Sequence, residues 1–221
     1  MDRIMTDRFD RRYLLGAALL APVALGGAGQ RAPERLREFS AQQQADITKI
    51  NAYLNGIHTL KSNFVQLGPD GQLDQGTLYL EKPGRLRFSY QPPSPTTIVA
   101  TGGRVYVKNA RLNTVDHYDL SDTPLGILLD ENINLMRNPA VLGVEEQNGA
   151  LVLRARTSAN RNQSNIALVF TAPEVQLRQW MVKDNQGGTT TVALTGTMTG
   201  VPLDESLFDI PVKAPSIRKN G

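Results

Sequence analysis

The 221-residue sequence predicts a mainly β protein, an incomplete and strongly curved antiparallel β-barrel with a helical lid. Three observations support this prediction: a hydrophobic period of two through most of the chain, turn residues at regular intervals, and two interruptions with helical spacing. A sheet of about 10–11 strands cannot stay flat, because each strand twists relative to its neighbour. We therefore expect the sheet to curl and the α-helices to close a hydrophobic cavity on its concave side.

The first 29 residues have the pattern of a cleaved export signal. Arg11 and Arg12 precede an apolar run from Tyr13 to Leu25, which is shorter than the roughly 20 residues that span a bilayer. The paired arginines favour the twin-arginine route, and a general export signal that contains two arginines is the alternative. Either route places the mature protein in the periplasm.

The composition argues against several functional classes. The chain has no cysteine, which excludes disulfides, thiol nucleophiles and the lipid-bearing cysteine of an anchored lipoprotein. Aromatic residues make up only 6% and basic residues are scattered, so no nucleic-acid binding is expected. His58 and His117 lie far apart, and no catalytic motif occurs. We therefore expect no enzyme activity, no metal site and no cofactor.

The first element after the leader is an amphipathic helix over residues 42–60, which would place His58 in its last turn. Asp46, Lys49 and Asn51 are expected on its solvated face. Apolar residues recur at spacings of three and four: Ile47, Ile50, Leu54 and Ile57.

Strands are predicted on both sides of a second helical segment. About six lie between Lys61 and Asp119, with Pro83-Gly84 and Gly102-Gly103 among the turns, and about four follow Pro139. The helical insert between the two groups has Asp122 or Thr123 as its N-cap. In LYLEKPGRLRFSY, residues 78–90, alternation places the charged Lys82 on the same face as two leucines.

Several segments in this order resemble the periplasmic outer-membrane lipoprotein carriers, the LolA family. The most specific is G-x-L-x-L-x-[RK]-P, here Gly76 to Pro83, followed by an apolar-alternating strand. Phe64-x-Gln66 and the L-x-x-x-x-F segment from Leu203 to Phe208 support the resemblance. The resemblance covers residues 40–212, which it implies form a single half-barrel domain, with residues 213–221 as a C-terminal tail.

The resemblance implies a monomeric periplasmic carrier of acylated lipoproteins. Such a carrier takes its cargo from an ABC-type transporter in the inner membrane and delivers it to an acceptor in the outer membrane. An envelope-stress sensor or lipid-binding regulator with the same half-barrel is one alternative, and the outer-membrane acceptor itself is another.

Alternation and the resemblance together give candidate wall residues for an acyl-binding cavity. For each of them, ordinary core packing is the alternative. They are Phe64, Leu78, Leu80, Leu86, Phe88, Tyr90, Ile98, Val105 and Val107 from the strands, and Leu125, Leu128 and Leu129 from the lid.

The resemblance implies a latch at Lys82. In the family this position holds an arginine that bonds to the lid backbone and keeps the empty cavity closed. A lysine offers three donors from one point instead of a planar fork of five, so the latch would be weaker or differently connected. The alternative is a lysine that extends to solvent from the strand end. Arg85 and Arg87 alternate outward, as possible docking groups for an acidic transporter loop or as a solvated strand face.

Overall fold

The computed structural model describes residues 38–123, 125–156, 165–183 and 186–210. The chain divides into two units, residues 1–35 and 36–221, and every described residue belongs to the second. The predicted export signal and the predicted C-terminal tail lie outside the described residues. In the described part, no helix is long and apolar enough to cross a membrane.

The described part of the chain consists mainly of strands. Its helical elements are α1 (Ala41–Asn55), α2 (Gly126–Leu129) and the 3-10 turns η1 (Leu120–Asp122) and η2 (Glu205–Phe208). Its strands are β1 (Thr59–Leu67), β2 (Leu73–Glu81), β3 (Arg85–Tyr90), β4 (Thr96–Thr101), β5 (Arg104–Asn109), β6 (Thr114–Asp119), β7 (Val141–Gln147), β8 (Ala150–Arg156), β9 (Asn165–Thr171), β10 (Leu177–Lys183) and β11 (Thr189–Thr199).

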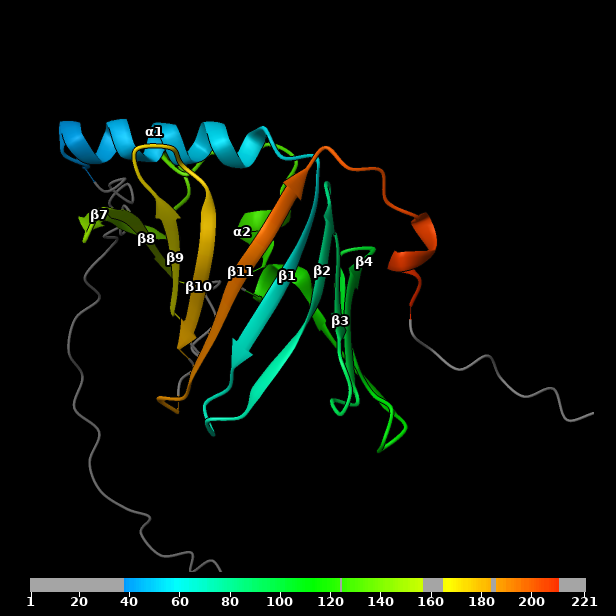
Figure 1. The fold of residues 1–221 in the computed structure, drawn as a ribbon. Coiled ribbons are helices and arrows are strands. Elements are labelled where there is room, and N and C mark those ends of the chain that lie inside the picture. Colours follow the sequence, from blue (N-terminus) through cyan, green and yellow to red (C-terminus); the bar gives the residue numbers. More distant parts are fainter. Residues whose placement is uncertain (1–37, 124, 157–164, 184–185, 211–221) are drawn as a thin grey trace, which may run out of the picture. The chain divides into compact units, whose positions relative to one another are not determined.

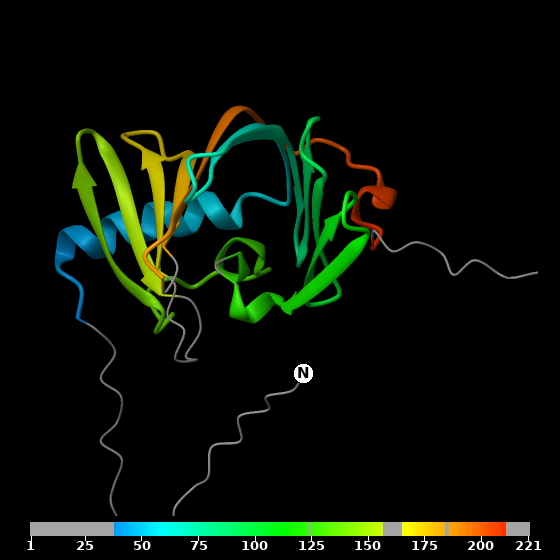
Figure 2. The ribbon, with the colours of Figure 1, turned by 90° about the horizontal axis from the view of Figure 1, so that it is seen from below.

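All eleven of these strands form one antiparallel sheet in the order β6-β5-β4-β3-β2-β1-β11-β10-β9-β8-β7. The pairing of β1 with β11 joins the two halves of the chain, and β6 and β7 are the two edges. The predicted incomplete antiparallel barrel is therefore confirmed. Figure 1 shows α1 across the ends of β8–β11, and Figure 2 shows the curl of the sheet around α2.

The distance between two aromatic rings shows how strongly the sheet is curved. Phe88 on β3 and Trp180 on β10 have ring centroids 6.1 Å apart, although three strands separate β3 from β10 in the sheet order. Four inter-strand steps in a flat sheet would separate them by about 19 Å. The inward side chains therefore meet across the concave side of the sheet.

The first helix is shorter than the sequence pattern predicts. It begins with a capping box, in which the Gln43 amide donates to Ser40 Oγ at 3.2 Å and Ser40 N donates to Gln43 Oε1 at 3.1 Å. It ends at Asn55, because Gly56 caps it and β1 begins only four residues later. The placement of His58 in the last helical turn was therefore wrong; it lies in the turn before β1.

The expected solvated face of α1 was also partly wrong. Asp46 is only 4% exposed and accepts hydrogen bonds from Gln42 and Lys49 of the same helix. Asn51 Oδ1 accepts from the Leu135 amide at 3.0 Å. The burial of Asp46 and the bond of Asn51 to a residue outside the helix could not be seen in the helical period alone.

The helical insert contains less helix than expected. Its regular part is η1 and the four residues of α2, whose N-cap is Leu125 rather than Asp122 or Thr123. The insert is attached to α1 through an asparagine. Asn55 Nδ2 donates to the Ile133 carbonyl and Asn55 Oδ1 accepts from the Ile133 amide, both at 2.9 Å. We call α1 and residues 120–135 the helical cover.

Candidate functional site

The candidate wall residues lie on the concave face of the sheet and on the underside of the cover. Val107 is partly buried and lies outside the main cluster of described apolar residues. The other eleven belong to that cluster or pack against it. They are Phe64 on β1, Leu78, Leu80, Leu86, Phe88, Tyr90, Ile98 and Val105 on β2–β5, and Leu125, Leu128 and Leu129 at α2. The interior surface is thus apolar and covered by the protein's own side chains.

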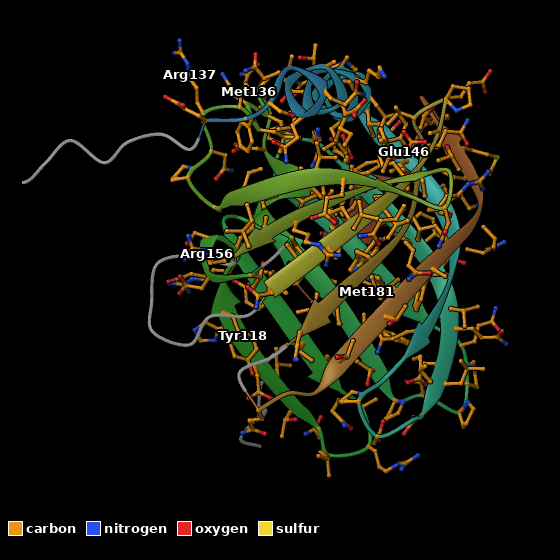
Figure 3. All side chains as sticks on the ribbon, turned by 90° about the vertical axis from the view of Figure 1, so that its left-hand side faces the viewer. Tyr118, Met136, Arg137, Glu146, Arg156 and Met181 are labelled. Atoms are coloured by element: carbon orange, nitrogen blue, oxygen red, sulfur yellow. The ribbon has the colours of Figure 1, made fainter. Side chains whose placement is uncertain are left out.

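Four aromatic side chains bridge this interior. Phe64 packs edge-to-face against Phe88 and Tyr90, with centroid distances of 5.1 Å in both pairs. Trp180 reaches Phe88 from the other half of the sheet and is only 3% exposed. Trp180 points inward, while Met181 lies on the opposite face of β10 (Figure 3).

The glycine of the G-x-L-x-L-x-[RK]-P segment makes room for this aromatic cluster. Gly76 lies opposite Phe64 in the β1–β2 pair. A Cβ atom there would lie 2.8 Å from the Phe64 ring and 2.1 Å from the Ser89 carbonyl oxygen. Only glycine therefore allows the phenylalanine ring to lie over β2.

Lys82 connects the β2–β3 turn to the helical cover. Its Nζ donates to the Leu54 carbonyl in the last turn of α1 at 2.7 Å. Burial lowers the pKa of Lys82 to about 8, against the nearby charge of Asp130, which raises it. Two residues further on, the Gly84 amide donates to the Leu129 carbonyl at the end of α2, at 2.9 Å. The turn thus holds both helices of the cover through their terminal carbonyls.

Three polar side chains share the concave face with the aromatic cluster. Tyr90 Oη donates to Gln66 Oε1 at 2.9 Å, and Asp74 pairs directly with Gln66 across β1 and β2. Burial raises the pKa of Tyr90 to about 12, and the negative charge of Asp74 adds to the rise. A carboxylate and an amide therefore lie beside an otherwise apolar surface.

Comparison with known proteins places this architecture in a family. The family model described as outer membrane lipoprotein carrier protein LolA matches residues 55–211, more than half of the chain. The chain belongs to the LolA family. The resemblance seen in the sequence is thereby confirmed.

Two relatives with the name outer-membrane lipoprotein carrier protein show how far the sequences have diverged. The protein from Methylococcus capsulatus is 25% identical over 177 residues, covering 75% of this chain and 84% of its own. The protein from Cupriavidus necator is 24% identical over 186 residues, covering 77% and 87%. A solved LolA superfamily structure from Nitrosomonas europaea has a TM-score of 0.42 at 10% identity, covering 76% of this chain and 97% of that chain. The LolA family is one of non-enzymatic binding proteins, in agreement with the prediction that this chain is not an enzyme.

The two arginines after the LolA-type segment have partners within the chain. Arg85 forms an ion pair with Glu81 at 2.7 Å and lies over the Phe208 ring at 5.4 Å. Arg87 donates to the Leu207 carbonyl at 3.1 Å. Both point outward, as alternation predicts, and both hold η2 against the convex face of the sheet. Their docking role stays a prediction.

The candidate set omitted about half of the interior of this LolA-family chain. Alternation is unclear in ALVLRAR and NIALVF, where consecutive residues are apolar, so no inward face was assigned there. Phe170, opposite Tyr53 of α1 at 6.0 Å, shows that this half also faces the cover. The inward residues missed on β8–β11 are Leu151, Leu153, Ile166, Leu168, Phe170, Leu177, Trp180, Val192 and Leu194.

Proposed function

We propose that this chain is a periplasmic carrier that binds the acyl chains of lipoproteins between its curved sheet and its helical cover. It receives them from an ABC-type transporter in the inner membrane and passes them to an acceptor in the outer membrane. Membership of the LolA family and the names of the relatives support the lipoprotein cargo. The export pattern at the amino terminus supports the periplasmic location.

The observation that carries the proposal is the apolar interior, which extends over both halves of an unclosed sheet and under both helices. Its members include Phe64, Trp180 and Phe170 from strands far apart in the sequence. Transfer of acyl chains to such a surface gains about 0.8 kcal/mol for each CH₂ group. Part of that gain is offset, because the same side chains must first separate from one another.

The attachment of the cover suggests how the interior opens. Asn51 and Asn55 bind α1 to residues 133–135 through three hydrogen bonds, so these parts of the cover are joined to each other. At the β2–β3 turn, the cover is held by the Lys82 and Gly84 hydrogen bonds. We infer that the cover moves as one body away from this turn and that Lys82 favours the closed, empty state.

Closure of the empty interior gives a physical reason for release. A loaded carrier keeps the Lys82 hydrogen bond broken, and reforming it offsets part of the affinity for the cargo. Hand-over to the acceptor then needs no energy source at the outer membrane. In this proposal the candidate wall residues bind the acyl chains, and Lys82 holds the cover closed when the interior is empty.

The proposal is tested by extraction of a fluorescent lipoprotein from membranes that contain its ABC-type transporter. The mature chain should remove the lipoprotein under ATP turnover as a soluble one-to-one complex. Cargo that stays in the membrane would contradict the carrier function.

Lys82→Leu tests the latch in the same assay. Because the variant loses the bond to Leu54, it should retain cargo longer and pass it on about tenfold more slowly, as expected for the loss of a hydrogen bond from a charged donor. Lys61→Leu, on the convex face over Tyr79, is the matched control and should transfer normally. Equal transfer rates for both variants would show that Lys82 has no latch role.

A further inference from the structure

One end of the concave face is polar. Gln66, Asp74 and Tyr90 occupy inward positions beyond Phe64 and Phe88, near the turn that joins β1 to β2. In Figure 1 this turn lies at the opposite end of the sheet from α1. An acyl chain that enters from this end passes the three polar side chains before it reaches the aromatic cluster.

The hydrogen bond between two of these groups leaves a donor available. Tyr90 Oη donates to Gln66 Oε1, and its ring is fixed against Phe64 and Phe88 with centroids at 5.1 Å and 6.2 Å. The pKa of Tyr90 is about 12, so its phenol is a hydrogen-bond donor at neutral pH. No described residue accepts a hydrogen bond from Gln66 Nε2. This amide group can therefore donate to a ligand.

The third group is an uncompensated negative charge. Asp74 accepts from Gln72 Nε2 at 3.3 Å, and no described cation lies within ion-pair distance of it. Asp74 lies directly opposite Gln66 in the β1–β2 pair, so its carboxylate is beside the concave face, where its charge adds to the raised pKa of Tyr90. An anionic group placed beside Gln66 would meet this field.

Acylated polypeptides and phospholipids differ in the groups that would lie at this polar end of the concave face. Acylated polypeptides and phospholipids carry the same kind of fatty chain, and both carry carbonyl groups where the chains join the polar part. Beyond that point a phosphatidylglycerol has a negative phosphate, whereas an N-acylated lipopeptide continues with neutral amides. A carbonyl buried at the edge of an apolar site needs a donor, and a phosphate next to a carboxylate is repelled.

We propose that Gln66, Asp74 and Tyr90 select neutral acylated polypeptides over anionic phospholipids. Gln66 donates to a carbonyl at the base of the acyl chains, Tyr90 holds the Gln66 amide in place, and Asp74 repels a phosphate. This selection rests on the proposed function, since it requires acyl chains in the interior.

The test is a competition between two probes with the same acyl chains. One is a synthetic peptide with an S-diacylglyceryl, N-acylated amino-terminal cysteine, and the other is phosphatidylglycerol. Native mass spectrometry gives the ratio of the two complexes within one sample, so a loss of folded protein does not change the result. The wild-type chain should prefer the lipopeptide.

Asp74→Asn should shift this ratio toward phosphatidylglycerol about three- to tenfold, because it removes one charge that repels the phosphate. The effect is limited because the carboxylate is partly exposed and solvent screens it. Gln66→Leu should weaken lipopeptide binding by a similar factor, through the loss of one hydrogen bond. Asp70→Asn, on the exposed tip of the same hairpin, is the matched control and should leave the ratio unchanged.

The two proposals fail in different ways. If the wild-type chain binds the lipopeptide but Asp74→Asn leaves the ratio unchanged, the selection is wrong and the carrier function is unaffected. A wild-type preference for phosphatidylglycerol would also overturn the selection. If the wild-type chain binds neither probe, the proposed function itself fails.

Discussion

The concave and convex faces of β2 and β3 are both covered, but the two covers are attached differently. On the concave side, Leu78 and Leu86 pack in the apolar cluster under the helical cover, which is held at the adjoining turn by the hydrogen bonds of Lys82 and Gly84. On the convex side, Arg85 and Arg87 bind η2 through a cation–π contact and a hydrogen bond. Apolar contacts have no direction, whereas the arginine contacts do.

The difference indicates which cover can move. When the helices move away, acyl chains can cover the apolar surface that the helices leave, because helices and acyl chains bury apolar surface equally well. Phe208, buried on the convex side, has no such replacement, and separation of η2 would break the Arg87 hydrogen bond to Leu207 and the Arg85 contact with the Phe208 ring. We therefore expect the convex side to remain fixed while the concave side opens.

The largest effect is expected at Gly76, on the concave side. Gly76→Val should lower the free energy of unfolding by about 3 kcal/mol or more, because a Cβ cannot fit between the Ser89 carbonyl and the Phe64 ring. Urea denaturation measures the change. Gly56→Ala is the control and should be nearly neutral, since its backbone is already helical and the new Cβ has ordinary contacts. Equal stability of both variants would show that the Phe64 packing is not as described.

A smaller effect, confined to stability, is expected at Phe208. Phe208→Ala should lower the free energy of unfolding by about 2–3 kcal/mol, because it removes the buried side chain that packs between η2 and the convex face and leaves a cavity there. Lipopeptide binding per folded molecule should not change. Ile210→Ala, at a side chain 40% exposed, should cost less than about 0.5 kcal/mol. A loss of lipopeptide binding in folded Phe208→Ala would show that the convex face takes part in binding.

The smallest effect concerns the charge of Lys82. Its pKa is about 8 in the folded protein and 10.5 ordinarily, so between these values the unfolded chain binds more protons. The free energy of unfolding should therefore rise with pH across this window in the wild-type chain, relative to Lys82→Met. The difference should stay below about 1 kcal/mol, because solvent screens the half-buried amine. Parallel pH dependence in urea denaturation of the two proteins would contradict the burial of Lys82.

The sequence predicts the sheet well because β-alternation is a local signal. The strands from Lys61 to Asp119 follow it, and so does the inward direction of Leu78, Leu80 and Lys82. The strands after Pro139 number five in the described part, one more than expected, because β7 was missed: its sequence VLGVEEQ ends in polar residues and does not alternate. The length of α1 and the burial of Asp46 depend on what packs against the helix, which no local pattern contains.

The candidate site shows the same limit. Alternation could give the direction of Lys82 but not its acceptor, the Leu54 carbonyl, which lies 28 residues away. It could place Arg85 and Arg87 outward, but not show that η2, more than 100 residues later, lies on them. The mid-strand Gly76 was a usable signal, because a glycine in a strand often marks a close approach of a neighbouring group.

The most direct test of the account is whether acyl chains reach the interior. Trp180 is the single tryptophan of the chain, is buried, and touches Phe88 across the sheet. Its fluorescence should be quenched by a bound lipopeptide that carries bromine on its acyl chains, and much less by one that carries bromine on its peptide. Stoichiometric binding without quenching from the brominated chains would place the acyl chains elsewhere and contradict the account.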